Sequence, residues 1–289
     1  MIGLDSLIWV WYNNNMKKIT KAIIPVAGWG TRRLPITKTI EKCMLPVGNR
    51  PIIDYVVEDC IKAGITDIYF VVSEGSTQVK SFYSRNQKLE EYLKANGKEK
   101  YLEAVTPPAG INFHFIEQDP NGKYGTAIPV YLVAKEIGDE PVLVLMGDDF
   151  IYNRDGSSDV ARLVEQAGEG SALLGAQVAP DEVSRYGVIE LDAEHNFKQI
   201  VEKPAPEDAP SNLINISKYV LNAKAVAMIK DYAERDDIQG EYYITVPLND
   251  YVGSGQALKV VPAEGVYLDG GTVEGWVHAN RVVIEGHNS

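Results

Sequence analysis

The sequence predicts an α/β fold in which a mostly parallel central sheet is flanked by helices. Three apolar runs, residues 22–26, 68–72 and 141–146, are continuous enough to be strands buried on both faces. Between the first two runs, apolar residues recur at helical spacing from 52 to 61, and the pattern stops at Gly64. Strand, helix and strand in this order form a βαβ unit, which requires parallel pairing.

The first strand ends in a cationic loop that opens with Gly28 and Gly30. Backbone N–H groups at glycines can approach a phosphate, and nearby cations neutralise its charge. Arg33 stands where the third glycine of a Rossmann fingerprint belongs, and no GxxxxGK[ST] sequence occurs. We therefore expect a polyphosphate site of another kind; a surface loop with solvated charges is the alternative. The cations of the loop are Arg32, Arg33, Lys38 and Lys42.

The next segment adds a surface insertion and a third strand. Residues 78–100 are polar and helix-prone, so we expect a helical insertion that lies on the surface. Residues 111–116 are predicted to form a strand, and Gln118 follows it. A glycine-spaced turn over 119–125 then leads into a helix over 126–136.

The second half adds antiparallel strands to the sheet. Residues 186–191 and 197–201 alternate in polarity around a turn, which predicts a hairpin. No internal repeat or interdomain linker is evident, so we expect a single domain over 16–289, preceded by a poorly ordered N-terminal extension over 1–15. The remaining predicted strands are 172–178, 214–221, 258–262 and 265–268, and the remaining predicted helices are 159–166, 223–233 and 272–283.

Composition argues against several classes of function. The formal net charge of -12 gives no general attraction to nucleic acid or to an anionic membrane, so we expect neither as a partner. Cys43 and Cys60 form no CxxC pair, and the four histidines show no HxxH or HExxH spacing, so no zinc site or disulfide framework is predicted. The apolar run at 7–12 is too short to span a bilayer and lacks the flanks of a signal peptide, so we expect a cytoplasmic protein.

Carboxylates follow two of the predicted strands. Asp148 and Asp149 come directly after the run 141–146, and Asp269 follows the strand 265–268. Carboxylates at the carboxyl ends of strands suit a hard cation such as Mg²⁺, and two of them could share one ion. Helix capping or a solvated turn is the alternative for each of them.

A further strand ends in the adjacent opposite charges Glu202 and Lys203, before Pro204. Glu202 could accept hydrogen bonds from hydroxyl groups, and Lys203 could reach a phosphate. A solvated strand end is the alternative, and it is the more common outcome for such a pair read alone.

Taken in order, seven segments resemble bacterial UTP–glucose-1-phosphate uridylyltransferases of the sugar-nucleotidyltransferase superfamily. The resemblance covers residues 18–284 and includes a polar insertion like that at 78–100. It implies a single Rossmann-like nucleotidyltransferase domain. The segments are AIIPVAGWGTRRLPITKTIEKCMLPVGNRPIIDYVVE, FIEQDPNGKYGTA, GDD, SRYGVIE, VEKP, PSNL followed by KYVL, and LDGGTVEGWVHAN.

The resemblance also implies residue roles. Arg32 and Lys42 would be catalytic, on the nucleotide phosphates. The nucleotide would further contact Ala27, Gly28, Gly30, Gln118 and Gly125. The sugar and its phosphate would contact Gly187, Glu202 and Lys203, and Mg²⁺ would be held by Asp148 and Asp269. Ser217 and Lys218 depart from the Gly-Arg that usually precedes Tyr-Val-Leu in this family.

The implied reaction is in-line, Mg²⁺-assisted attack of glucose 1-phosphate on the α-phosphorus of UTP, which gives UDP-glucose and pyrophosphate. A sugar phosphate is already ionised near pH 7 and needs no general base, in keeping with the lack of an evident catalytic histidine. Thymidylyl transfer, transfer to another hexose 1-phosphate and, in a different class, a non-catalytic nucleotide-sugar binding protein stay open as alternatives. A homo-oligomer, dimer or tetramer, is expected.

Overall fold

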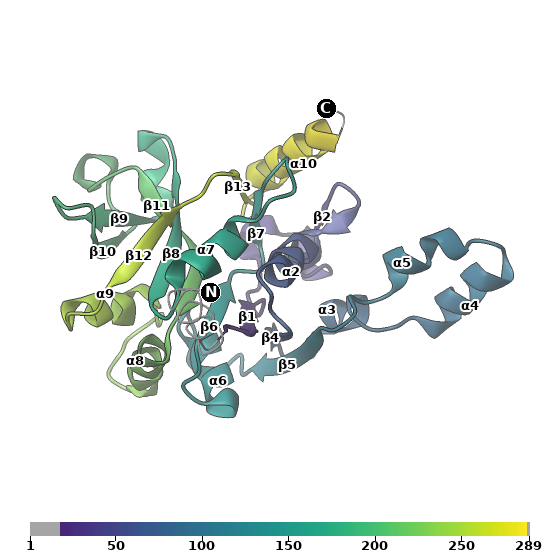
Figure 1. Ribbon diagram of the computed structural model, residues 1–289, viewed down its shortest axis with the longest axis horizontal. Helices are drawn as coiled ribbons and strands as arrows, with labels where there is room; N and C mark the ends of the chain where they lie inside the picture. The colour runs from purple at the N-terminus through teal and green to yellow at the C-terminus, as the bar shows by residue number, and fades with distance from the viewer. Residues whose placement is uncertain (1–17, 288–289) are drawn as a thin grey trace, which may run out of the picture.

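The computed structural model describes residues 18–287 (Figure 1). The predicted extension over 1–15 lies outside the described residues. Within them, no helix is long and apolar enough to cross a membrane.

The central sheet contains a parallel half, as the sequence predicts. Strand β1 (Lys21–Pro25) lies between β4 (Asp67–Ser73) and β6 (Val142–Leu145), and it is parallel to both. Strand β5 (Asn112–Gln118) extends the sheet beyond β4, again in parallel. The apolar runs give β1 and β6 cores that are buried on both faces.

The other half of the sheet is mixed. Strand β11 (Leu213–Leu221) runs antiparallel to β6 and to β8 (Ser171–Gln177), and β12 (Leu258–Pro262) is parallel to β8. Strands β9 (Gly187–Leu191) and β10 (Phe197–Glu202) form an antiparallel hairpin at the sheet edge, which confirms the predicted pairing.

Two short ribbons lie outside the central sheet. Strand β7 (Asp149–Tyr152) pairs antiparallel with β13 (Val266–Asp269), and β2 (Pro46–Val47) pairs with β3 (Arg50–Pro51). The sequence did not predict β7, because it has only four residues and directly follows the carboxylates that end the buried run. Its pairing places Asp149 opposite Asp269.

Helices cover both faces of the sheet. One apolar core includes residues of α2, α7 and α10, and the other includes residues of α6, α8 and α9. The sequence missed α9, whose nine residues include Pro247 in the first turn. The bounds are α2 (Ile52–Lys62), α6 (Ile128–Ile137), α7 (Asp159–Ala167), α8 (Ala223–Glu234), α9 (Thr245–Gly253) and α10 (Val273–His287).

A helical arm projects from the body of the molecule (Figure 1). It comprises α3 (Gln78–Phe82), α4 (Gln87–Ala95), the short 3₁₀ helix η4 (Glu99–Tyr101) and α5 (Leu102–Val105). Of the apolar side chains on α4, Leu93 is buried and Tyr92 is exposed. The arm is anchored at its base, where Val79 of α3 is buried in the apolar core of the body.

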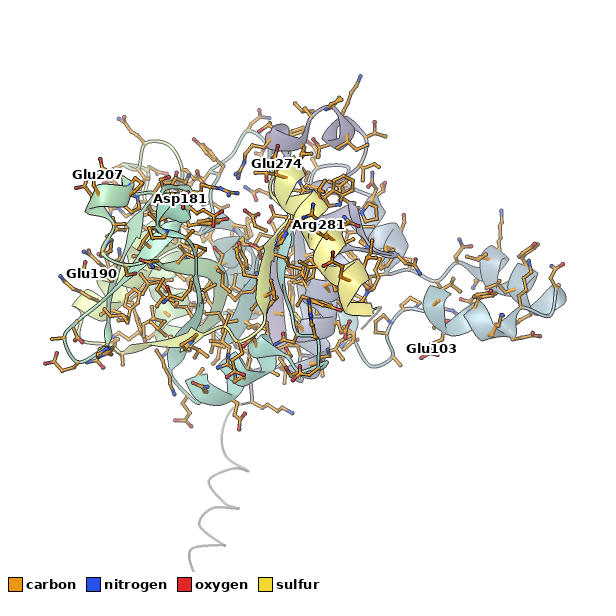
Figure 2. The ribbon with its side chains drawn as sticks, turned by 90° about the horizontal axis from the view of Figure 1, so that it is seen from above. Glu103, Asp181, Glu190, Glu207, Glu274 and Arg281 are labelled. Carbon is orange, nitrogen blue, oxygen red and sulfur yellow. The ribbon has the colours of Figure 1, made fainter. Side chains whose placement is uncertain are left out.

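Negative charge is spread over the outside of the molecule. Figure 2 shows the exposed carboxylates of Glu103, Asp181, Glu207 and Glu274 in separate parts of the molecule. The net charge of -12 therefore comes largely from surface residues, and a locally cationic site is compatible with it.

Candidate active site

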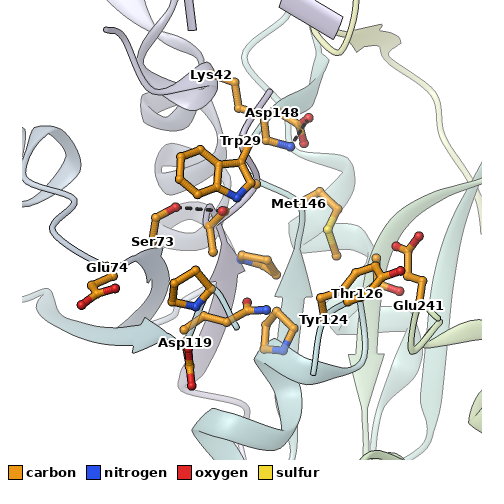
Figure 3. A pocket seen from close by; sticks show the side chains of 17 residues that line it. Trp29, Lys42, Ser73, Glu74, Asp119, Tyr124, Thr126, Met146, Asp148 and Glu241 are labelled. Carbon is orange, nitrogen blue, oxygen red and sulfur yellow. Dashed lines mark hydrogen bonds and ion pairs between the residues drawn. The ribbon is translucent and has the colours of Figure 1, made fainter. Parts of the chain in front are cut away.

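A cavity of about 390 Å³ opens at the carboxyl ends of the four parallel strands (Figure 3). Each strand contributes a residue at or just after its end: Pro25, Ser73, Gln118 and Met146. The carboxyl ends of parallel strands are where α/β sheets bind ligands. Predicted nucleotide-contacting residues that line the cavity are Ala27, Gly28, Gln118 and Gly125. Residues that the sequence did not single out are Trp29, Tyr124 and Glu241.

The loop after β1 folds back over the cavity. Gly30 adopts φ 63°, a left-handed conformation that favours glycine, and its carbonyl accepts a hydrogen bond from the Thr37 hydroxyl at 2.8 Å. A Cβ at Gly28 would lie 3.2 Å from the Lys42 ammonium, so glycine leaves room for that side chain. Gly30 does not line the cavity; it shapes the turn that carries Gly28 and Lys42.

Lys42 and Asp148 form an ion pair in the cavity wall (Figure 3). The ammonium nitrogen lies 2.8 Å from Oδ2 of the carboxylate. Burial works against both charges, yet the pairing holds the pKa of Asp148 below its ordinary value and the pKa of Lys42 above its own. Both groups therefore stay ionised at neutral pH. Cys43, beside Lys42, is buried, and burial raises the pKa of its thiol, so it is no nucleophile at neutral pH.

Asp269 is brought close to Asp148 by the ribbon of β7 and β13. Its carboxylate accepts hydrogen bonds from the Tyr186 hydroxyl at 3.2 Å and from the Gly271 backbone N–H at 2.6 Å. The Arg185 guanidinium lies 3.5 Å away. Asp269 lines a second cavity, of about 1030 Å³, together with Tyr186 and Arg185. The two predicted metal ligands therefore line different cavities, Asp148 the first and Asp269 the second.

A buried ion pair involves Asp149, the residue that directly follows the predicted metal ligand Asp148. Lys218 pairs with Asp149, whose carboxylate also accepts a hydrogen bond from the Tyr267 hydroxyl at 3.0 Å. A bulge in β11, with Ser217 at φ 54°, carries Lys218 into this position. The sequence assigned no role to Lys218; its departure from the family pattern was the only signal.

The predicted sugar-binding residues come together at the open end of the β9–β10 hairpin. Gly187 and Glu202 are direct partners in the ladder, and the Thr245 hydroxyl donates a hydrogen bond to Glu202 at 2.8 Å. Lys203 adopts φ 45°, and its backbone N–H donates to the Tyr186 carbonyl at 3.0 Å. Gly187, Glu202 and Lys203 lie outside both cavities, and Glu202 and Lys203 are exposed.

The two loop arginines differ sharply. Arg32, predicted to contact phosphate, is exposed on the 3₁₀ helix η1 (Thr31–Arg33) and lines neither cavity. Arg33, which the sequence left without a role, is only 3% exposed. An exposed guanidinium on a loop is free to reach a ligand, whereas a buried one is not.

The carboxylates of Asp148 and Asp269 fit a magnesium ion by donor chemistry. Mg²⁺ prefers oxygen ligands and is commonly held by one or two carboxylates, with water and substrate phosphates completing its shell. No cluster of three or more His, Cys, Asp or Glu residues suited to a metal occurs in residues 18–287. The pair therefore suits a metal that arrives with phosphate ligands better than an all-protein metal site.

Comparisons with known proteins agree on one family. The nucleotidyl transferase family profile matches residues 21–286. A UTP–glucose-1-phosphate uridylyltransferase of Streptococcus pyogenes serotype M1 is 36% identical over 225 residues, which cover 74% of this chain and 73% of that protein. A UTP-bound UGPase from Acinetobacter baumannii has a TM-score of 0.80 at 26% identity, covering 92% of this chain and 93% of its own. A UDP-glucose pyrophosphorylase complexed with UDP-glucose has a TM-score of 0.77 at 29% identity, covering 92% and 99%.

Proposed function

This chain belongs to the nucleotidyl transferase family, and we propose from that membership that it transfers the uridylyl group of UTP to glucose 1-phosphate. One structural observation supports the proposal independently of the family relationship. The ionised Lys42–Asp148 pair, 2.8 Å apart, lies in the wall of a cavity at the ends of four parallel strands. Such a site offers a cation for phosphate and a carboxylate for a metal in one place.

The reaction needs positioning more than proton transfer. A phosphate oxygen of glucose 1-phosphate attacks the α-phosphorus of UTP, and the bond from that phosphorus to the β-phosphate bridging oxygen breaks. The products are UDP-glucose and pyrophosphate. The second pKa of a phosphate monoester lies near 6, so the nucleophile is already an anion at neutral pH. The Lys42 ammonium would stabilise charge on the transferring phosphoryl group, with Arg32 on the same loop.

We propose Mg²⁺ as the cofactor, held by Asp148 and Asp269. When bound, it would supply charge neutralisation for the phosphates. The ion pair of Lys42 with Asp148 orients that carboxylate in its absence. The hydroxyl of Tyr186 does the same for Asp269.

The sugar phosphate would bind at the hairpin end. Glu202 would accept hydrogen bonds from sugar hydroxyls, and the Thr245 hydroxyl already fixes its orientation. A Cβ at Gly187 would lie 2.8 Å from the Ile200 side chain and 3.3 Å from the Glu202 carboxylate, so a larger residue there would displace one of these side chains. Lys203 would pair with the 1-phosphate.

A panel of hexose 1-phosphates with UTP and Mg²⁺ tests the sugar assignment. Formation of the nucleotide sugar is followed by chromatography. We expect glucose 1-phosphate to give the highest kcat/KM. A larger kcat/KM with another hexose 1-phosphate would move the assignment to that sugar. Tight UDP-glucose binding without turnover would favour the non-catalytic alternative.

We also propose a cytoplasmic homo-oligomer, a dimer or a tetramer. Two buried free cysteines suit a reducing compartment, and the arm exposes Phe82, Tyr92 and Tyr101 for contact between subunits. Light scattering would measure the mass of the particle. A monomer at micromolar concentration would contradict this assignment and leave the catalytic one untouched.

A further inference from the structure

Arg33 carries a buried charge that the reaction described above does not use. Its side chain is 3% exposed, and none of its three guanidinium nitrogens has a hydrogen-bond partner within residues 18–287. A guanidinium has five N–H donors, and leaving such donors buried and unpaired is costly. A structural role alone would be served better by an apolar side chain of similar size.

The guanidinium lies against the backbone that carries both proposed metal ligands. A Cβ at Gly270, next to Asp269, would lie 2.8 Å from Nη2 of Arg33 and 2.7 Å from the Asp148 carbonyl oxygen. Burial lowers the pKa of Arg33, while the negative charges of Asp148 and then Asp269 act in the opposite direction. The positive charge of Arg33 therefore interacts electrostatically with both carboxylates, but the guanidinium donates a hydrogen bond to neither.

Arg33 cannot itself contact a substrate in this structure. It lines neither cavity, and its nitrogen atoms are inaccessible. The cavities present other cations to the same carboxylates, Lys42 to Asp148 and Arg185 to Asp269. Arg33 can therefore affect a bound ligand only through Asp148 and Asp269, because it lies on their buried side and not in either cavity.

We propose that Arg33 is a positioning residue, a fixed internal counter-charge that lowers the affinity of the nucleotide-free protein for a divalent cation. A buried positive charge repels a second cation strongly, because little solvent screens the two. A nucleoside triphosphate brings enough negative charge to overcome this repulsion, so the metal would enter with the nucleotide. The proposal rests on the proposed function in one respect, the assignment of Asp148 and Asp269 as metal ligands.

Binding of Mn²⁺, a paramagnetic substitute for Mg²⁺, to the full chain without nucleotide tests this proposal. Free Mn²⁺ is measured by electron paramagnetic resonance in a titration. We expect Arg33→Met to bind Mn²⁺ about tenfold or more tightly than the parent protein, since it removes the repelling charge. Arg33→Lys keeps the charge and should stay near the parent affinity. Arg33→Gln provides a second neutral variant should the methionine variant fail to fold.

Arg281→Met is the matched control, because Arg281 is an exposed cation on α10 (Figure 2). It removes the same charge from the protein as a whole and should leave Mn²⁺ affinity unchanged. Unchanged or weaker Mn²⁺ binding by a folded neutral variant would overturn the proposal, as would tighter binding by Arg33→Lys.

Failure of the proposed function has a different signature. A protein that forms no UDP-glucose, yet binds Mn²⁺ more tightly as Arg33→Met, refutes the proposed function and supports the counter-charge. A protein that forms UDP-glucose but shows equal Mn²⁺ affinity in all variants refutes the counter-charge alone. Absence of Mn²⁺ binding in every variant, with and without UTP, refutes the metal assignment and this proposal with it.

Discussion

Replacing Lys218 by methionine tests the buried charges beneath the site. Lys218 is 1% exposed, and its ammonium pairs with the carboxylate of Asp149. That carboxylate also accepts a hydrogen bond from the hydroxyl of Tyr267. Methionine fills a similar volume, so Lys218→Met mainly removes the cation and leaves the carboxylate buried without it.

Breaking a buried ion pair by removing one partner costs about 3–5 kcal/mol of unfolding free energy. Burial already raises the pKa of Asp149 to about 6, even with Lys218 present, and loss of the ammonium raises it further. A carboxyl group whose pKa is raised in the folded state penalises folding above the pKa that it has in the unfolded chain, and the penalty grows with pH until the folded-state pKa is passed. The loss of stability should therefore be larger at pH 8 than at pH 5, and it should shrink as the pH falls through the raised pKa of Asp149.

Asp59 contributes in the same direction. Burial raises its pKa to about 6, and the positive charge of Lys218 acts against that rise. Removal of the ammonium should therefore raise the pKa of Asp59 as well, which adds to the pH dependence. The double variant Asp149→Asn/Lys218→Met separates the two carboxylates, because only Asp59 then remains to titrate.

Urea unfolding followed by circular dichroism at pH 8 and pH 5 measures the effect. Lys230→Met is the control, because Lys230 forms an exposed ion pair with Asp139 at 2.6 Å and its loss should change the unfolding free energy little at either pH. The Asp149→Asn/Lys218→Met variant should recover most of the stability at pH 8. A loss below about 1 kcal/mol, or one of equal size at both pH values, would contradict the role assigned to the Lys218–Asp149 ion pair.

Three further outcomes are expected. Lys42→Ala should lower kcat by orders of magnitude, whereas Lys38→Ala, an exposed cation of the same loop, should not; equal effects of the two would remove Lys42 from its role. Trp29 is 74% exposed in the cavity wall, so UTP should quench its fluorescence. If Trp29→Phe shows the same fluorescence change on addition of UTP as the parent protein, the contact is contradicted. Asp59→Asn should stabilise the protein by up to about 3 kcal/mol at pH 8, and little at pH 4, in urea unfolding.

The parallel half of the sheet was predictable from the sequence because buried parallel strands are continuous apolar runs. The run at 141–146 predicted β6 (Val142–Leu145), and the carboxylates after it were recognised as candidate ligands. The glycine-opened loop likewise pointed to the end of β1, where a cavity opens, and phosphate binding there stays a prediction. These signals are local, since each depends on a few consecutive residues.

The support beneath the site was not predictable, because it depends on contacts between distant segments. Nothing in the local sequence shows that β7 pairs with β13, which brings Asp149 opposite Asp269. A bulge in β11 directs Lys218 inward, and strand periodicity cannot reveal a bulge in advance. The exposure of Arg32 and the burial of Arg33 likewise depend on the turn at Gly30, which their own sequence does not reveal.

The most direct test of uridylyl transfer is a competition in one reaction. Equal concentrations of UTP and dTTP, with glucose 1-phosphate and Mg²⁺, give a product ratio equal to the ratio of the two kcat/KM values. We expect UDP-glucose as the main product, with pyrophosphate released in equal amount. A main product of dTDP-glucose, or no pyrophosphate release from either nucleotide, would contradict uridylyl transfer to glucose 1-phosphate.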